Sequence, residues 1–366
     1  MSAKTSIEWC DATWPVVVGC KEISPGCANC WAARLAATRL KQQPKYRGLA
    51  VIGANGHTHF NGDVRLWEPH LDWPLKWREP RRIFAASSSD LFHDALSPKH
   101  IAAVYGVMAA SQQHTFQVLT KRPENARAWY RWLAEQSRDD DTTWTTLLRE
   151  TCAMLGSDRL RDRIVEDGIA RDGVPKREPW PLPNVHVGVS VEDRKHGLPR
   201  IDVLREIPAT VRWLSIEPLL EDLGTIDLRG IDWVVVGGES TQDRSARPMH
   251  PAWVRSIRDQ CIAAGVKFHF KQWGTWAPYV DPDRYTHDAP EDESHSHVWM
   301  AADGAHGACW IYDGDGSWTN WTGEPPKSTD GERVRNDVVV FSPMGKKHSG
   351  RLLDGRTWDE FPEVRP

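Results

Sequence analysis

The sequence lacks a long apolar run and a strong excess of charge of one sign. No apolar stretch approaches the roughly 20 residues of a membrane-spanning helix. The first residues, Met-Ser-Ala-Lys-Thr-Ser, hold none of the apolar segment that directs secretion. The 366 residues carry a formal net charge of -4, which excludes an overall basic surface for nucleic acid. We therefore expect a cytoplasmic protein without membrane contact.

Cysteine is scarce as well, but three of the seven cysteines are concentrated in one short stretch. Cys20, Cys27 and Cys30 follow the pattern Cys-x6-Cys-x2-Cys, after an apolar run at 16–18 and before an alanine-rich helical pattern. Thiols stay reduced in the cytoplasm, and this spacing favours a metal centre over a disulfide. The turn at Pro25-Gly26 lets Cys20 approach the other two.

Two kinds of metal centre fit these cysteines. A structural zinc site needs four ligands, and Cys10 is the one further cysteine near enough in sequence. Cys10 precedes the expected strand, however, at the end opposite the loop. An iron-sulfur cluster held by three thiolates leaves one iron open for a ligand. We favour the cluster, with the zinc site and ordinary reduced cysteines as alternatives.

Short apolar runs, each ending in a polar residue, alternate with helical patterns along the chain. This alternation predicts a parallel sheet with right-handed crossovers. No glycine-rich dinucleotide fingerprint follows the first run, which argues against a doubly wound open sheet. We therefore expect an α/β fold with a partial or complete parallel (β/α) barrel of the TIM-like kind. The expected strands lie at 16–18, 83–86, 116–119, 185–189, 211–216, 233–236 and 266–270, and the helices at 30–42, 98–112, 123–136, 194–206 and 251–264.

Changes in composition suggest the domain boundaries. The barrel is expected to span 1–276, with a charged insertion at 137–183. Residues 277–366 are rich in Gly, Asp, His and Trp and are expected to form an irregular C-terminal extension with short strands at 308–312 and 337–342. We interpret its histidines at 287, 295 and 297 as part of an exposed polar loop.

Polar residues follow the expected strands at corresponding places. In a parallel barrel, the carboxyl ends of the strands gather at one mouth, where catalytic groups lie. A single charge at a strand end is usually solvated, but several around one ring indicate a ligand site. We expect the thiol loop to meet there with Ser88, Asp90, Lys121, Arg122, Ser190, Glu192, Glu217, Glu239 and Lys271.

Separate motifs occur in order along residues 6–276: the cysteine loop and residues 7–9, 11–14, 89–93, 119–123, 188–192, 215–219, 237–240 and 270–274. Together they resemble the three-cysteine-motif phage protein family, which occurs in bacteriophages and bacteria. That family is itself similar to the radical S-adenosylmethionine (radical SAM) superfamily. The resemblance implies a radical SAM-like barrel, a 4Fe-4S cluster on the three cysteines, S-adenosyl-L-methionine as cofactor and a reductant protein of the flavodoxin or ferredoxin type.

The sequence departs from the superfamily pattern in two places. The common spacing is Cys-x3-Cys-x2-Cys, so three extra residues precede Cys27 here. The triplet at 237–239 has the same residues as the superfamily's Gly-Gly-Glu motif, but it follows a strand late in the chain instead of the second strand. The amino-group-binding role of that motif is therefore not carried over to this chain.

The leading hypothesis is an enzyme that reductively cleaves S-adenosylmethionine to start radical chemistry. Ser88 and Asp90 are expected near the amino group of the cofactor, and Ser190 and Glu192 near its ribose. Glu217 is expected further along the ring of strand ends. Lys121, Arg122 and Lys271 are expected to hold an anionic substrate, and Glu239 is a further candidate catalytic residue.

The expected substrate is a nucleic-acid base or nucleotide, in repair or modification of DNA. This expectation rests on a basic segment at 76–82 and on aromatic residues expected near the mouth. One alternative is a non-catalytic zinc or iron-sulfur binding module. Another is a hydrolase or nuclease that holds a divalent metal with Asp90, Glu192, Glu217 and Glu239.

Overall fold

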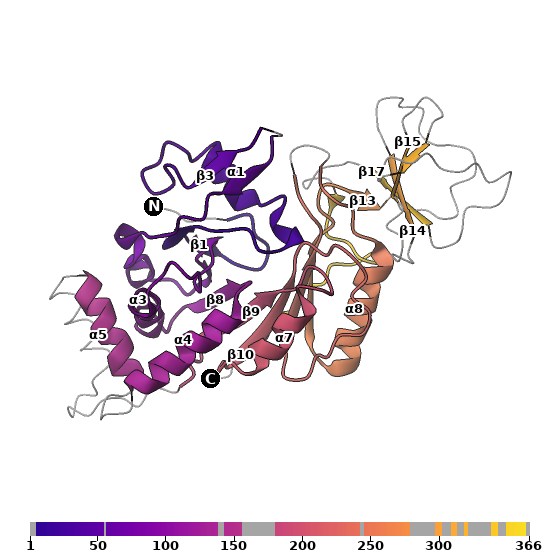
Figure 1. Ribbon diagram of the computed structural model, residues 1–366. Coiled ribbons are helices and arrows are strands. Elements are labelled where there is room, and N and C mark those ends of the chain that lie inside the picture. The colour runs from indigo at the N-terminus through magenta and orange to yellow at the C-terminus, as the bar shows by residue number, and fades with distance from the viewer. Residues whose placement is uncertain are drawn as a thin grey trace.

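A seven-stranded parallel sheet forms the centre of the protein (Figure 1). The strands of this sheet have the same order across the sheet as along the chain, as in a barrel. Within the part of the chain that the structure describes, the first and last strands do not pair, so the sheet is a curled half-barrel. The α/β prediction is confirmed. The strands are β1 (Ala12–Trp14), β6 (Arg82–Ala85), β8 (Thr115–Thr120), β9 (Val185–Ser190), β10 (Val211–Ile216), β11 (Trp233–Gly237) and β12 (Lys267–Gln272).

The computed structural model describes most of the chain. The described residues are 5–54, 56–137, 143–155, 180–241, 245–278, 297–301, 309–312, 318–320, 338–342 and 349–363. None of the helices in these ranges is long and apolar enough to cross a bilayer.

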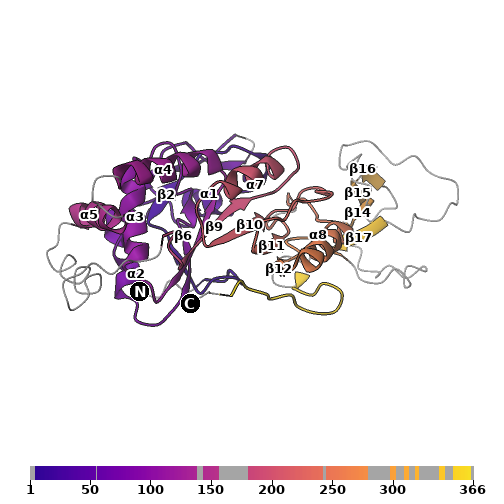
Figure 2. The same cartoon turned by 90° about the horizontal axis from the view of Figure 1, so that it is seen from below.

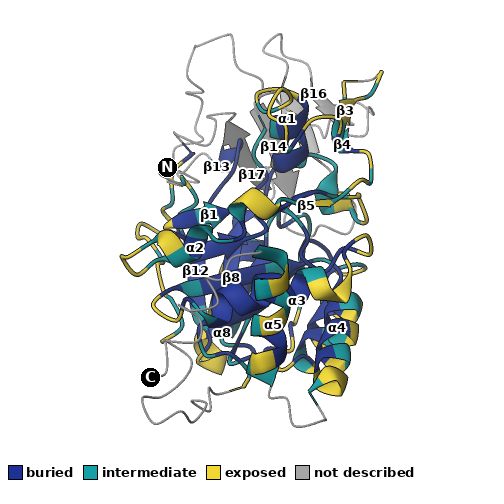
Figure 3. Ribbon diagram, turned by 90° about the vertical axis from the view of Figure 1, so that its left-hand side faces the viewer, coloured by how far each residue is buried: buried dark blue, intermediate teal, exposed yellow. Residues whose placement is uncertain are grey.

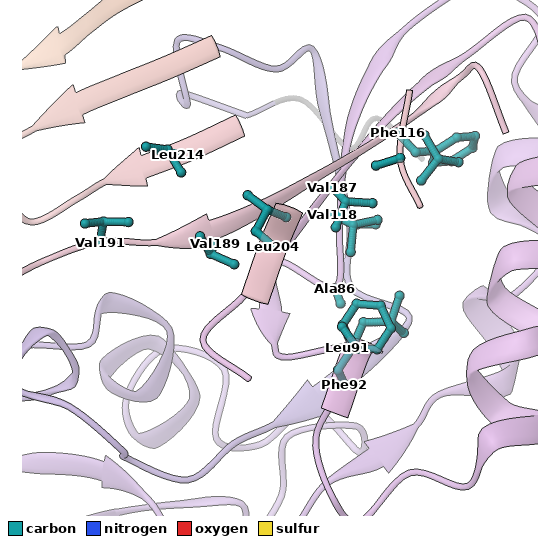
Figure 4. Close-up of a cluster of buried hydrophobic side chains, with 14 of the residues drawn as sticks. Ala86, Leu91, Phe92, Phe116, Val118, Val187, Val189, Val191, Leu204 and Leu214 are labelled. Atoms are coloured by element: carbon teal, nitrogen blue, oxygen red, sulfur yellow. The ribbon is translucent and has the colours of Figure 1, made fainter. Parts of the chain in front are cut away.

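Helices pack against the outer face of the sheet (Figures 1 and 2). Alternate strand residues such as Val118, Val187 and Leu214 point outward into one apolar core (Figure 4), and the centre of the molecule is buried (Figure 3). The predicted helices are present, and Gly265 ends the last one at φ +68°. The helices are α3 (Pro98–Ala109), α4 (Pro123–Gln136), α5 (Thr143–Leu155), α7 (Leu198–Arg205) and α8 (Pro251–Ala264).

Helix α5 lies within the expected insertion at 137–183 and packs closely on α3. Thr151 donates a hydrogen bond to the Ala103 carbonyl at 2.9 Å. A Cβ atom on Gly106 would lie 2.0 Å from the Thr151 hydroxyl, so the contact requires glycine. The first part of the insertion therefore extends the helical layer, and residues 156–179 lie outside the described residues.

The prediction for the first barrel strand is wrong. The run at 16–18 overlaps β2 (Val17–Gly19), which pairs with β5 (Arg65–Leu66) and β7 (Ser88–Ser89) in a separate three-stranded sheet. The barrel strand is β1, which lies just before it. Pro15 separates β1 from β2, and since proline has no N–H group it cannot continue the ladder.

The segment after β2 forms a small lobe beyond the mouth. It contains α1 (Trp31–Ala37) and the hairpin of β3 (Ala50–Ile52) and β4 (Thr58–Phe60), packed around buried alanines and Phe60. We call residues 20–66 the α1 lobe (Figure 1, upper left). A short helix, α2 (Trp73–Lys76), then leads into β6.

The C-terminal region forms an antiparallel five-stranded sheet in the order β13-β17-β14-β15-β16. The strands expected at 308–312 and 337–342 correspond to β15 and β17, whereas three others were not anticipated. The expected histidine loop lies outside the described side chains. The strands are β13 (Ala277–Pro278), β14 (His297–Ala301), β15 (Cys309–Tyr312), β16 (Trp318–Asn320) and β17 (Val338–Ser342).

Residues 349–363 return to the half-barrel and cover the free edge of β12. The amide of Phe270 donates to the Trp358 carbonyl at 2.9 Å, and the amide of Glu360 donates to the Phe268 carbonyl at 3.3 Å. The Phe361 ring then lies 5.5 Å from that of Trp233. By these contacts the segment belongs with the barrel, which the division at residue 276 did not anticipate.

Candidate metal centre at the half-barrel mouth

The lower interior of the half-barrel is filled by aromatic side chains. The Trp9 ring lies 4.8 Å from that of Phe84, 5.3 Å from Trp213 and 6.4 Å from Trp233. Cys10 packs in the same cluster. Because tryptophans fill the lower interior, a ligand can enter the half-barrel at the carboxyl ends of the strands.

A cavity of about 550 Å³ opens at those ends. It is lined by all three cysteines of the loop and by side chains at the carboxyl ends of the strands. The predicted site residues on its wall are Ser88, Asp90, Lys121, Arg122, Ser190, Glu217, Glu239 and Lys271. Glu192 lies behind this wall and is fully buried. The fold thus brings the predicted residues to one place.

The thiol loop, residues 20–30, has a tightly turned backbone. Gly19 enters the loop at φ +89°, and a Cβ atom there would lie 2.1 Å from the Asp63 carbonyl oxygen. The 3-10 helix η1 (Pro25–Cys27) continues into a turn in which the Cys30 amide donates to the Cys27 carbonyl at 3.1 Å. Cys30 then precedes α1, so Cys27 and Cys30 lie one turn apart on the cavity wall.

A cation lies beside each of two sulfurs. Lys121 Nζ is 3.6 Å from Cys27 Sγ, and Arg122 Nη1 is 3.8 Å from Cys20 Sγ. Burial raises the pKa of Cys27, but the charge of Lys121 and nearby hydrogen-bond donors outweigh it, so the pKa is lowered. Burial raises the pKa of Cys20 to about 12 and also raises that of Cys30.

Lys121 and Glu192 pair with each other and both bind Ser24 of the thiol loop. Lys121 Nζ is 2.9 Å from Glu192 Oε1 and 3.1 Å from Ser24 Oγ, and Ser24 also donates to Glu192. Arg200 Nη1 holds the other carboxylate oxygen at 2.7 Å. Burial raises the pKa of Glu192, but the two cations and the hydrogen bonds outweigh it and lower the pKa to about 2. Gly26 fits over this pair, because a Cβ atom there would lie 2.9 Å from Lys121 Nζ.

Glu239 binds the opposite side of the loop. Asn29 Nδ2 donates to Glu239 Oε2 at 3.0 Å, and Arg247 Nε donates to the same oxygen at 2.9 Å. Arg247 also donates to the Pro25 carbonyl at 3.1 Å. The acidic residue at the end of β11 therefore anchors the loop to the mouth.

Asp90 positions Arg122. Its carboxylate is 3.1 Å from Arg122 Nη1 and accepts from the Thr120 hydroxyl at 2.7 Å and the Lys121 amide at 3.0 Å. Arg122 in turn donates to the Lys21 carbonyl at 3.0 Å. Through these bonds Asp90 directs the guanidinium toward the Cys20 sulfur.

The far wall of the cavity carries one more ion pair. Lys271 Nζ is 2.8 Å from Glu217 Oε1, while Trp9 and Ser215 donate to Glu217 Oε2 at 3.3 and 3.1 Å. Burial lowers the pKa of Lys271, but the adjacent carboxylate outweighs it and leaves the pKa raised. The cavity therefore keeps an ammonium group opposite the thiol loop.

The donor types at the mouth suit a soft metal cluster better than a single ion. Among the described residues, no three Cys, His, Asp or Glu side chains converge on one ion position. The three thiols do line one cavity, and a cubane cluster takes each thiolate on a different iron, so its ligands surround the cluster rather than one ion. Three thiols are the donor set of such a cluster, and the cavity that they line is where it would be held.

Sequence reasoning missed several residues that hold the loop. Arg200 lies beside Ile201 and Leu204 on the buried side of α7. Because arginine is rarely buried without a partner, its place in that apolar pattern indicates a buried ion pair. Asn29 and Arg247 gave no such signal, because their contacts with Glu239 depend on the fold of the loop.

Comparison with known proteins assigns the chain to one family. No curated protein and no solved structure shows significant similarity to the chain. The matching family model is described as "Protein of unknown function (DUF5131)", and it covers residues 4–362, which include most of the C-terminal ninety residues that the motif resemblance left out. The chain therefore belongs to the DUF5131 family of proteins of unknown function.

Proposed function

We propose that this protein is a radical SAM-type iron-sulfur enzyme. One observation carries the proposal: Cys20, Cys27 and Cys30 come from one loop and line one cavity at the carboxyl ends of a parallel half-barrel. A 4Fe-4S cluster on these cysteines would supply the electron that cleaves S-adenosylmethionine. An external reductant of the flavodoxin or ferredoxin type would deliver that electron.

At Cys27, burial is outweighed by the charge of Lys121 and by hydrogen bonds, which lowers the pKa and supports ligation by a thiolate, whereas at Cys20 burial outweighs the charge of Arg122 and the pKa stays raised. Metals bind the thiolate form of cysteine, and nearby positive charge favours that form. Lys121 and Arg122 lie within 4 Å of two of the three sulfurs, and Asp90 and Glu192 hold these cations in place. In this proposal, Asp90 and Glu192 act on the cofactor through the loop and its cations.

The rest of the cavity would bind and orient the reactants. Ser190 and Ser88 present hydroxyl groups on the wall, and the Tyr46 hydroxyl fixes Ser88 at 3.1 Å. The Glu217–Lys271 pair offers one group of each sign. The Lys271 ammonium would bind an anionic substrate group, and the packed tryptophans beneath would exclude water from the floor.

The two alternatives find less support in the geometry. The zinc alternative needs Cys10, which packs in the barrel interior and does not line the cavity. The hydrolase alternative needs free carboxylates, but each of its four acidic residues is paired with a cation of its own: Asp90 with Arg122, Glu192 with Lys121, Glu217 with Lys271 and Glu239 with Arg247.

Cleavage of the cofactor tests the proposal. Protein purified without air, reconstituted with iron and sulfide and reduced with dithionite, is expected to convert S-adenosylmethionine to deoxyadenosine and methionine. The Cys27→Ala variant is expected to lose this conversion, whereas the buried control Cys261→Ala keeps it. Absence of deoxyadenosine from a fully loaded and reduced cluster would overturn the proposal.

A further inference from the structure

The α1 lobe differs in charge from the rest of the chain. Residues 20–66 contain seven lysines and arginines and two acidic residues, a net of +5, whereas the whole chain carries -4. Lys21, Arg39, Lys41 and Arg47 are exposed. The ion pairs among the described residues include none of these four. Since unpaired cations attract polyanions, this concentration favours a partner with regularly spaced negative charge.

The lobe also exposes aromatic and apolar side chains at the cavity entrance. Trp31 is 47% exposed and Ile23 is 38% exposed, and both line the cavity together with Lys21. An exposed indole that shares a wall with a cation, here Lys21, forms a stacking platform for bases. A partner that binds these residues therefore lies over the entrance of the cavity.

This entrance distinguishes between two polyanions. An acidic reductant protein could meet the outer cations, but it offers no row of bases to stack on the exposed indole of Trp31. A nucleic-acid strand can do both, because its phosphates stay outside while one base turns inward. In a duplex the faces of the bases are covered by their neighbours and cannot stack on Trp31, so the strand must be single or locally opened.

We infer that the α1 lobe binds the phosphate backbone of single-stranded nucleic acid and that Trp31 stacks on the base that enters the cavity. This names the substrate class of the proposed enzyme. The role of the bound strand as a substrate rests on the proposed function, whereas its binding does not. The sequence had suggested the basic segment at 76–82 for this role. That segment precedes β6 at the opposite end of the sheet, and two of its cations are paired, Lys76 with Asp72 and Arg82 with Asp11.

Oligonucleotide binding by the full chain tests the inference. The probe is a fluorescent single-stranded DNA of mixed sequence, followed by anisotropy over a range of salt concentrations. The triple variant Arg39→Gln, Lys41→Gln, Arg47→Gln is expected to bind at least tenfold more weakly. Its slope of log K against log salt is expected to fall by about 2, the value for three lost phosphate contacts.

Two matched controls separate this surface from general effects of charge and aromatic loss. Lys76→Gln, Arg78→Gln, Arg81→Gln removes three cations at the opposite end, and it is expected to bind like the wild type. Trp31→Leu is expected to weaken binding about fivefold or more, while Trp180→Leu, which removes a 37% exposed tryptophan elsewhere, is expected to have no effect.

The binding assay needs no cluster, so its outcome is independent of the cleavage assay. Binding that follows the α1 lobe in a protein that never cleaves S-adenosylmethionine would support the inference and overturn the proposed function. Absent or salt-independent binding, or equal losses in the two triple variants, would overturn the inference. Loss of reduction by flavodoxin in the α1-lobe variant, with oligonucleotide binding intact, would also overturn it.

Discussion

At the scale of single residues, the charges at the mouth are organised by one another. The sequence indicated that Lys121, Glu192 and Glu239 would lie at strand ends, because each follows an apolar run. It could not indicate that Lys121 pairs with Glu192, or that Glu239 binds Asn29, because these contacts join segments 71 and 210 residues apart. Strand ends are a local property of the chain, whereas partners depend on how the strands come together.

Glu192 gives a prediction at this scale. Its carboxylate is fully buried between Lys121 and Arg200, so Glu192→Gln leaves both cations without their partner. We expect the free energy of unfolding at neutral pH to fall by about 3 kcal/mol, as for other broken buried ion pairs. Urea unfolding measures this loss. The exposed pair of Arg127 and Glu206 provides the control, since Glu206→Gln should cost less than about 1 kcal/mol.

The same residue predicts a pH dependence. The pKa of Glu192 is about 2 in the folded protein and 4.5 for an ordinary glutamate, so the unfolded chain binds more protons between these values. Its stabilisation is therefore complete above about pH 4.5 and is lost as the pH falls toward 2. The difference between the wild type and Glu192→Gln should narrow over that range. A difference that stays constant down to pH 2 would contradict the assignment.

At the scale of elements, local patterns predicted most strands and helices, and the failures have identifiable causes. The run at 83–86 became β6 because nothing interrupts its pairing. The run at 16–18 left the barrel because Pro15 breaks the ladder before it. Residues 349–363 have no helical or strand periodicity, and their position comes from backbone hydrogen bonds to β12, which no local pattern encodes.

The turn into the thiol loop gives a prediction for this scale. Gly19→Ala places a Cβ atom 2.1 Å from the Asp63 carbonyl oxygen at a residue with φ +89°. Gly48→Ala at φ +75° meets no atom within 4 Å, so it reports the backbone strain alone. We expect about 1 kcal/mol of destabilisation for Gly48→Ala and at least about 3 kcal/mol for Gly19→Ala. Equal unfolding midpoints for the two variants would show that the close approach is not required.

At the scale of the whole molecule, the half-barrel is completed by segments from both ends of the described chain. Trp9 fills the interior, and residues 349–363 cover the free edge of β12 and extend to Arg82, whose guanidinium lies 4.2 Å from the Phe361 ring. The thiol loop and the rest of the α1 lobe lie over the mouth. A site built from so many distant segments is sensitive to the whole fold, which explains why sequence alone located its residues but not its contacts.

Removal of the C-terminal segment tests this arrangement. A chain ending at residue 348 exposes the edge of β12 and the ring of Trp233. Exposed strand edges pair with other chains. We expect a lower melting temperature and self-association in size-exclusion chromatography, whereas the single substitution Phe361→Ala should lower the melting temperature and leave the protein monodisperse. A truncated protein that melts and elutes like the full chain would contradict the role given to this segment.

The iron and sulfide content of protein purified without air tests the central proposal most directly. We expect about four iron and four sulfide ions per chain, with the broad visible absorption of an iron-sulfur cluster. The variant with alanine at positions 20, 27 and 30 should lose both ions, and Cys10→Ala should retain them. A colourless protein that binds zinc, or iron that persists in the triple variant, would contradict a cluster held by the thiol loop.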